Sequence, residues 1–106
     1  MRQSSFVIDI EFSKQKELIY ISHLDVVRLF MRTFRRADLP LVYTQGYNPH
    51  PKISFKRALR LGVKGNKEKM TMYCTHAIDI KSEKKNLNAL LPKGVTISKM
   101  VHRRER

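Results

Sequence analysis

The chain has 106 residues, of which 42% are apolar and 29% charged, and it contains only 4 glycines and 4 prolines. This length fits one domain, residues 1–106, with a single core. The apolar content excludes a collagen-like, low-complexity or wholly disordered chain, because enough surface can be buried to offset the entropy lost on folding. The 22 Lys and Arg outnumber the 9 Asp and Glu, and this net charge of +13 favours a polyanionic or acidic partner.

The positive charge is concentrated in the second half of the chain. Residues 1–51 contain seven basic and five acidic residues, whereas residues 52–106 contain fifteen basic and four acidic residues, a net charge of +11. The single cysteine, Cys74, cannot form an internal disulfide. The first residues do not predict a signal peptide, and no stretch approaches the roughly 20 apolar residues that span a bilayer. We therefore expect a cytoplasmic protein that does not bind membranes.

Alternating apolar and polar side chains predict a first strand over residues 6–12, whose outward face would carry Val7, Asp9 and Glu11. Ser22 is a typical helix N-cap, and the helix that follows should run to about Ala37. The spacing of its apolar residues predicts an inward face made of Leu24, Val27, Phe30, Met31 and Phe34. A separate flank of this helix would be strongly cationic, with Arg28, Arg32, Arg35 and Arg36.

The remaining elements predict the fold class. Beyond Pro40 we expect a short extended run at 41–43, a stiff loop at 45–51, a strand around 53–55 and a polar turn at 62–69. A third main strand would occupy 70–75, Ser82 would cap a second helix, and 95–97 would begin the last strand. This order is typical of a ferredoxin-like α+β fold, a split β-α-β arrangement with two helices on one face of an antiparallel sheet. The core should span about 6–101, with a frayed basic tail at 102–106.

Several segments resemble the radical SAM-linked proteins, a family of uncharacterised bacterial domains found beside, or fused to the C-terminus of, radical S-adenosylmethionine enzymes. The resemblance covers about residues 8–101. It rests on Ile21-Ser22-His23-Leu24-Asp25, on residues 35–40 and 45–55, and on Leu59, Leu61-Gly62-Val63 and Glu68. It implies an accessory role for a neighbouring enzyme and an association with RNA processing and the ribosome. The chain departs from the family pattern at Lys64, Gly65, Asn66 and Lys67, where serine and acidic residues are usual.

Catalytic candidates are weak in this sequence. One cysteine cannot supply the three thiolates that a radical SAM cluster needs, and Cys74 is expected to be buried on an apolar strand face, where a thiol is inert. His76 is interpreted as a strand-end residue. His23, Asp25 and His50 together could hold a metal or act as acid and base. Anchoring of the 45–51 loop by these histidines, with Asp25 in a helix cap, explains the same residues, so we expect no metal and no cofactor.

Binding candidates are stronger. The rigid loop at 45–51 suits stacking of a base or gripping of a peptide, although an ordered crossover sealing the sheet edge explains it equally well. Its members are Gln45, Gly46, Tyr47, Asn48, Pro49, His50 and Pro51. Repulsion among the basic residues would be relieved by phosphates. The candidate RNA-binding residues are Arg28, Arg32, Arg35, Arg36, Lys52, Lys56, Arg57, Arg60, Lys64 and Lys67.

Three functions remain open from the sequence. The first is a non-catalytic RNA-binding adaptor that presents tRNA or ribosomal RNA to a radical SAM or other RNA-acting enzyme. RNA would then bind the arginine helix, the 45–51 loop and the 52–69 segment, because Asp9 and Glu11 argue against the open sheet face. The second is a protein-docking subunit that uses the 45–51 loop. The third is a small metal-binding or acid/base enzyme that uses His23, Asp25 and His50.

Overall fold

β1 is one of the two interior strands of the sheet, and its alternate residues are buried in the core. In the computed structural model, which describes residues 6–103, β1 pairs antiparallel with β3 on one side and with β4 on the other. A short β2 adds to the far edge of β3, which gives the order β2-β3-β1-β4. The elements are β1 (Phe6–Lys14), η1 (Lys16–Tyr20), α1 (His23–Arg36), β2 (Ile53–Phe55), β3 (Gly65–Cys74), α2 (Ile80–Leu90) and β4 (Val95–His102).

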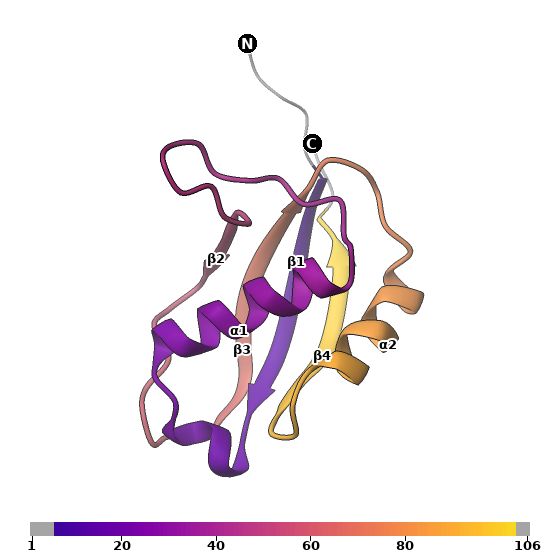
Figure 1. The fold of residues 1–106 in the computed structure, drawn as a ribbon. Coiled ribbons are helices and arrows are strands. Elements are labelled where there is room, and N and C mark those ends of the chain that lie inside the picture. Colours follow the sequence, from indigo (N-terminus) through magenta and orange to yellow (C-terminus); the bar gives the residue numbers. More distant parts are fainter. Residues whose placement is uncertain (1–5, 104–106) are drawn as a thin grey trace.

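Both helices cover the same face of this sheet, and the other face is open (Figure 1). The strand order and the two helical crossovers confirm the predicted α+β class, and the arrangement is compatible with a ferredoxin-like split β-α-β fold. No helix in the described part of the chain is long and apolar enough to cross a membrane.

The core lies between the sheet and the helices. Ile8, Ile10 and Phe12 of β1 are almost completely buried there. Phe12 packs edge-on against Phe30 of α1, with ring centroids 4.9 Å apart, and against Phe55 of β2, at 5.9 Å. Such aromatic pairs add to the stabilisation from buried area, so they fix α1 over β1 and β2.

α1 begins as predicted, but its buried face is rotated from the expected one. The Ser22 hydroxyl accepts a hydrogen bond from the Asp25 amide at 3.1 Å. The residues buried in the core are Val26, Phe30, Thr33 and Phe34. The prediction that Leu24 is a core residue is wrong, because Leu24 lies about 120° from Phe30 around the helix axis and is 54% exposed.

The second half of the chain corrects three predictions. β3 begins at Gly65 and includes residues expected to form a turn, because its first residues pair with β1 although their side chains are mostly polar. Asp79, not Ser82, caps α2, since its carboxylate accepts from the Ser82 amide at 3.4 Å. The predicted fraying is wrong for residues 102–103, because β4 includes His102 and the Arg103 amide donates to the Val7 carbonyl at 2.7 Å. Residues 104–106 lie outside the described part.

Candidate nucleic-acid interface

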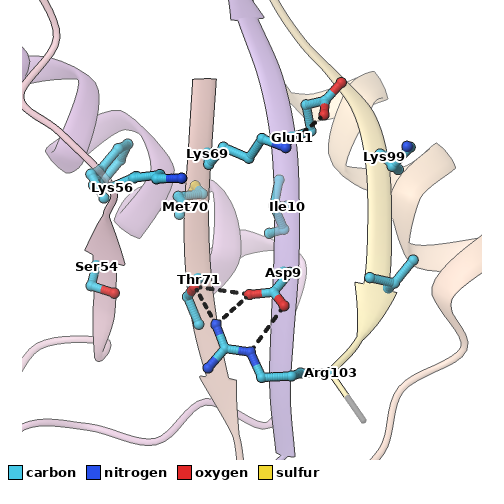
Figure 2. A pocket seen from close by; sticks show the side chains of 12 residues that line it. Asp9, Ile10, Glu11, Ser54, Lys56, Lys69, Met70, Thr71, Lys99 and Arg103 are labelled. Carbon is cyan, nitrogen blue, oxygen red and sulfur yellow. Dashed lines mark hydrogen bonds and ion pairs between the residues drawn. The ribbon is translucent and has the colours of Figure 1, made fainter. Parts of the chain in front are cut away.

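The open face of the sheet carries a pocket of about 500 Å³ that is lined by residues from all four strands and from the ends of β2 and β4. Figure 2 shows the polar side chains standing on this face, with both helices behind the sheet. The charged residues that line it are Asp9, Glu11, Lys56, Lys69, Lys99 and Arg103. Four cations therefore face two carboxylates across one shallow surface.

The Asp9 carboxylate is already bound by protein groups. Arg103 donates to it through two nitrogens, at 2.7 Å to Oδ1 and 3.0 Å to Oδ2, and the Thr71 hydroxyl donates to Oδ1 at 3.0 Å. The hydrogen bonds from Arg103 lower the pKa of Asp9, with Thr71 and the charge of Lys69 acting in the same direction. Asp9 therefore stays ionised and compensated, although Arg103 is separated from it by most of the chain.

Glu11 is compensated in the same way. The Lys69 ammonium lies 3.3 Å from its carboxylate, and this hydrogen bond lowers the pKa of Glu11, with help from the charges of Lys99 and Lys67. The charge of Lys69 is compensated by Glu11, but Lys56, Lys67 and Lys99 form no ion pair within the described residues. The open face is therefore net positive. Asp9 and Glu11 of β1 predicted an acidic face, but the cations that compensate them come from the neighbouring strands.

An aromatic side chain lies on the same face. Tyr73 alternates with the buried Cys74 in β3 and is half-buried, and the Lys52 ammonium lies 4.8 Å from the centroid of its ring. The ammonium lies over the ring, so a nucleobase that stacks on Tyr73 would take the place of the ammonium, which could then contact a phosphate. Sequence analysis missed Tyr73 in this role. Its alternation with Met72 and Cys74 was the available signal.

The predicted basic residues do not form one surface. The four arginines of α1 are exposed on the helical side, opposite the pocket, and Arg28 pairs with Asp25 at 3.7 Å. Lys56 lines the pocket, and Lys67 acts on Glu11 from the same side. Lys69, which also lines the pocket, belongs to the predicted 52–69 segment, whereas Lys99 and Arg103 were not predicted to bind RNA.

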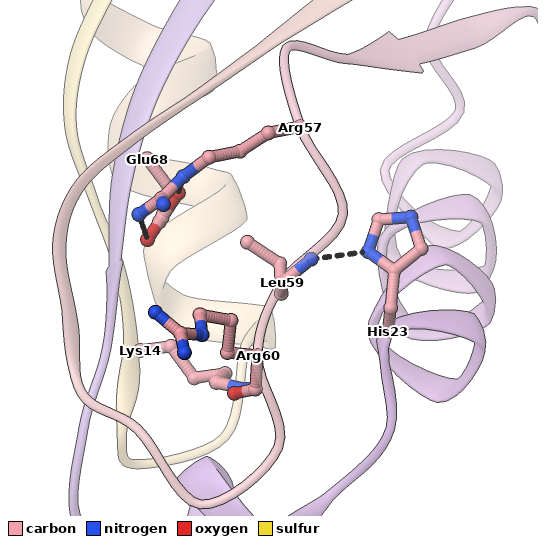
Figure 3. A network of polar contacts seen from close by, with 6 residues as sticks. All are labelled: Lys14, His23, Arg57, Leu59, Arg60 and Glu68. Atoms are coloured by element: carbon pink, nitrogen blue, oxygen red, sulfur yellow. Dashed lines mark hydrogen bonds and ion pairs between the residues drawn. The ribbon is translucent and has the colours of Figure 1, made fainter.

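Arg57, Arg60 and Lys64 lie in the connection between β2 and β3, which is fixed to the core by a polar network (Figure 3). Arg57 donates to the buried Glu68 through two nitrogens, at 2.8 and 3.1 Å. The buried Lys14 donates to the Arg60 carbonyl at 3.1 Å, and desolvation lowers the pKa of its ammonium. Arg57 is thus a structural residue whose charge is compensated, and it contributes little to an anion-binding surface.

His23 belongs to the same network. Its Nδ1 accepts a hydrogen bond from the Leu59 amide at 3.1 Å, and its ring packs edge-on against Phe55 with centroids 5.1 Å apart. His23 therefore anchors a loop, but the loop is the β2–β3 connection and not residues 45–51. His23 contacts this connection because the first turn of α1 lies beside it.

The other catalytic candidates are not brought together. His50 is exposed, and its Nδ1 lies 3.3 Å from the Pro51 carbonyl oxygen. Within residues 6–103 no group of three or more His, Cys, Asp or Glu side chains is arranged to hold a metal ion. Cys74 is buried as predicted, and desolvation raises the pKa of its thiol to about 11. His76 is exposed beyond the end of β3 and contacts the Thr75 hydroxyl at 2.7 Å.

The 45–51 loop is the tip of a small hairpin beside β3. The Lys52 amide donates to the Val42 carbonyl and the Thr44 amide to the His50 carbonyl, both at 2.8 Å. Gln45 to His50 are exposed, including the whole side chain of Tyr47, whereas Pro51 is buried. Gly46 has a φ of +121°, a conformation open to glycine alone among ordinary residues. The hairpin projects from the sheet (Figure 1), and its residues are not among those that line the pocket.

Comparison with known proteins gives a family without an assigned function. No curated protein and no solved structure matches this sequence. Residues 8–106 match the family described as "Uncharacterized protein conserved in bacteria (DUF2344)", a match that extends from β1 through β4. Nearly the whole chain is covered, and the protein therefore belongs to this uncharacterised bacterial family.

Proposed function

We propose that the protein is a non-catalytic RNA-binding domain that holds single-stranded segments of tRNA or ribosomal RNA on the open face of its sheet. The observation that carries the proposal is the pairing of both carboxylates on this face, Asp9 with Arg103 and Glu11 with Lys69. These pairs leave Lys56, Lys67 and Lys99 as uncompensated charges around the pocket.

The chemistry of this face suits an extended nucleic-acid strand. Lysine ammonium groups neutralise phosphates and release the counterions that condense on them, which drives binding without regard to base sequence. Tyr73 offers a ring on which a base can stack, and stacking of this kind contributes about 1–3 kcal/mol per base. The bases of a duplex are already stacked on one another, so they could not stack on this ring.

The adaptor part of the proposal concerns a partner enzyme. Resemblance to the radical SAM-linked proteins favours a radical SAM or other RNA-modifying enzyme as the protein to which RNA is presented. The buried Cys74, whose thiol pKa is raised by desolvation, and the hydrogen bond of the His23 ring to the Leu59 amide favour a non-catalytic domain. The reaction would accordingly take place on the partner.

Fluorescence anisotropy tests RNA binding directly. A labelled single-stranded RNA of about twenty nucleotides should bind with a Kd in the micromolar range at about 50 mM salt and more weakly at 200 mM. The same RNA annealed to its complement should bind less tightly. Absence of binding up to about 100 μM protein at low salt, or tighter binding of the duplex, would contradict the proposal.

A second candidate function is protein docking through the 45–51 loop, which the complete exposure of Tyr47 favours. A rigid loop loses little entropy when it binds. Tyr47→Ala with His50→Ala should abolish co-purification of a radical SAM enzyme encoded nearby and leave RNA affinity unchanged. Loss of RNA affinity with the enzyme still bound would instead place the loop in the RNA site.

A further inference from the structure

Four large apolar side chains are exposed on three neighbouring segments at one corner of the molecule, away from the open sheet face. We name them the apolar corner. Its members and their exposed fractions are Tyr20 (70%), Leu24 (54%), Leu61 (62%) and Val63 (47%). They come from η1, from the first turn of α1 and from the connection between β2 and β3.

Two hydrogen bonds establish that these segments are neighbours. The Gly62 amide donates to the Ile19 carbonyl at 2.6 Å, which places Leu61 and Val63 beside the residue that precedes Tyr20. The Leu59 amide donates to His23, the residue that precedes Leu24, at 3.1 Å. Figure 1 shows η1 and this connection side by side at the end of α1, and Figure 3 shows the contact with His23.

Exposure of this group is not explained by the fold. Scattered apolar residues on a surface are ordinary, but neighbouring ones mark an interaction site more often. The core of the protein is complete without them, because the inward face of α1 uses Val26, Phe30 and Phe34. Each of the four side chains therefore keeps apolar area in water that a partner could cover.

The charges around the apolar corner indicate what that partner is. Lys16 begins η1, and Arg60 and Lys64 flank the two aliphatic residues of the connection. All three are exposed, and none forms an ion pair within residues 6–103. Of the nearby carboxylates, Asp25 is paired with Arg28 at 3.7 Å, whereas Glu17 of η1 is exposed and forms no ion pair within residues 6–103. In the described part of the chain, the rim therefore keeps three unpaired cations against one unpaired carboxylate. An apolar surface with a cationic rim is complementary to an apolar surface with an anionic rim.

We propose that the apolar corner binds an acidic amphipathic segment of a partner protein, with apolar side chains covering Tyr20 and Leu61 and carboxylates meeting Lys16, Arg60 and Lys64. The surface is preorganised for this. The Gln15 amide donates to the Gly94 carbonyl at 2.7 Å, so the start of η1 is tied to the turn before β4, and its end is tied to the β2–β3 connection through Ile19 and Gly62. A rigid surface of this kind loses little entropy on binding. RNA on the open sheet face and protein at this corner could be bound together.

Designed peptides of about four helical turns test the proposal, with leucines on one face and glutamates on the other. Isotope-labelled protein is titrated with this peptide, with a version whose glutamates are replaced by lysine, and with a version whose leucines are replaced by alanine. Only the first should give saturable resonance shifts, and these should centre on the apolar corner. Tyr20→Ser and Leu61→Ser should each raise its Kd about tenfold, as expected for residues at the centre of an interface. The matched control is Tyr43→Ser, which alters an exposed tyrosine elsewhere and should leave the Kd unchanged.

Other outcomes would overturn the proposal. Equal binding of the alanine version would show that charge alone attracts the peptide, and no binding of the acidic peptide at about millimolar concentration would show that the corner has no such specificity. Binding of anionic lipid vesicles or of RNA that Tyr20→Ser abolishes would assign the corner to those ligands instead. Thermal unfolding of each variant separates lost folding from lost binding. RNA anisotropy of Tyr20→Ser should match the unaltered protein, so this test is independent of the proposed RNA face.

Discussion

Removal of two unpaired lysines from the open face gives the sharpest test of where RNA binds. The double variant Lys56→Gln with Lys99→Gln takes away two cations that line the pocket and form no ion pair in the described structure. It leaves the Arg103–Asp9 and Lys69–Glu11 pairs intact, so the sheet should keep its stability.

The expected magnitude follows from the number of free charges. If Lys56, Lys67 and Lys99 each contact one phosphate of a single strand, the logarithm of affinity should fall with the logarithm of salt concentration with a slope of about −2. Affinity should then drop about twentyfold between about 50 and 200 mM salt. The double variant retains one such contact, so its slope should be about −0.7. If the affinities of the two proteins are equal at about 1 M salt, this difference in slope makes the affinity of the variant lower by roughly sixtyfold at about 50 mM salt.

Two matched variants locate the effect. Lys81→Gln with Lys93→Gln removes the same charge from α2 and the turn that follows it, and should change affinity by less than about threefold because these residues lie away from the pocket. Arg32→Gln with Arg35→Gln removes two positive charges from the exposed flank of α1. All are measured by anisotropy over a salt series. Equal losses in all three variants would show that only total charge matters. A loss confined to the α1 variant would refute the open face and restore the arginine helix as the RNA site.

Three further predictions concern stability and reactivity. Gly65→Ala should lower the free energy of unfolding by about 1–3 kcal/mol in urea titrations, because a Cβ there would lie 2.8 Å from Cγ of the buried Glu68; an unchanged midpoint would contradict this. The pKa values of Asp9 and Glu11 are lowered in the folded state, so the stability from these pairs is present above the pKa of the unfolded chain and is lost as pH falls below about 4. Unfolding curves at pH 7 and pH 3 should show that loss, and Asp9→Asn should reduce it. Cys74, with its thiol pKa raised to about 11, should resist a thiol reagent at about pH 8 until urea unfolds the protein, and rapid labelling of folded protein would show that the strand opens.

Local sequence patterns predicted the elements and the class of the fold. Alternation in β1, the Ser22 cap of α1 and the order of strands and helices each depend on residues close in the chain, and all are present in the structure. The pattern of apolar and polar residues did not predict the start of β3, where polar residues form a strand. Residues Gly65–Lys69 pair with β1 through their backbones, which do not depend on side-chain polarity.

The candidate site was less predictable than the fold. Sequence analysis identified the excess of basic charge but placed it on α1 and in the loops, because the neighbours of each strand were unknown. Arg103 compensates Asp9 across 94 residues of chain, a contact that exists only through the pairing of β1 with β4. A one-residue change in that register would send Arg103 to the other face of the sheet.

Hydrophobic periodicity and capping residues in the sequence therefore determined that this chain forms two helices on an antiparallel sheet. Its composition determined that it carries a large positive charge. The tertiary structure decided which of those charges form no ion pair in the described residues and which face of the sheet they occupy. It also brought the segments that carry Tyr20, Leu24, Leu61 and Val63 to one corner. The physical reason is that helix and strand formation is governed by near neighbours along the chain. Compensation of charge and exposure of apolar groups depend instead on partners that only folding brings within contact distance.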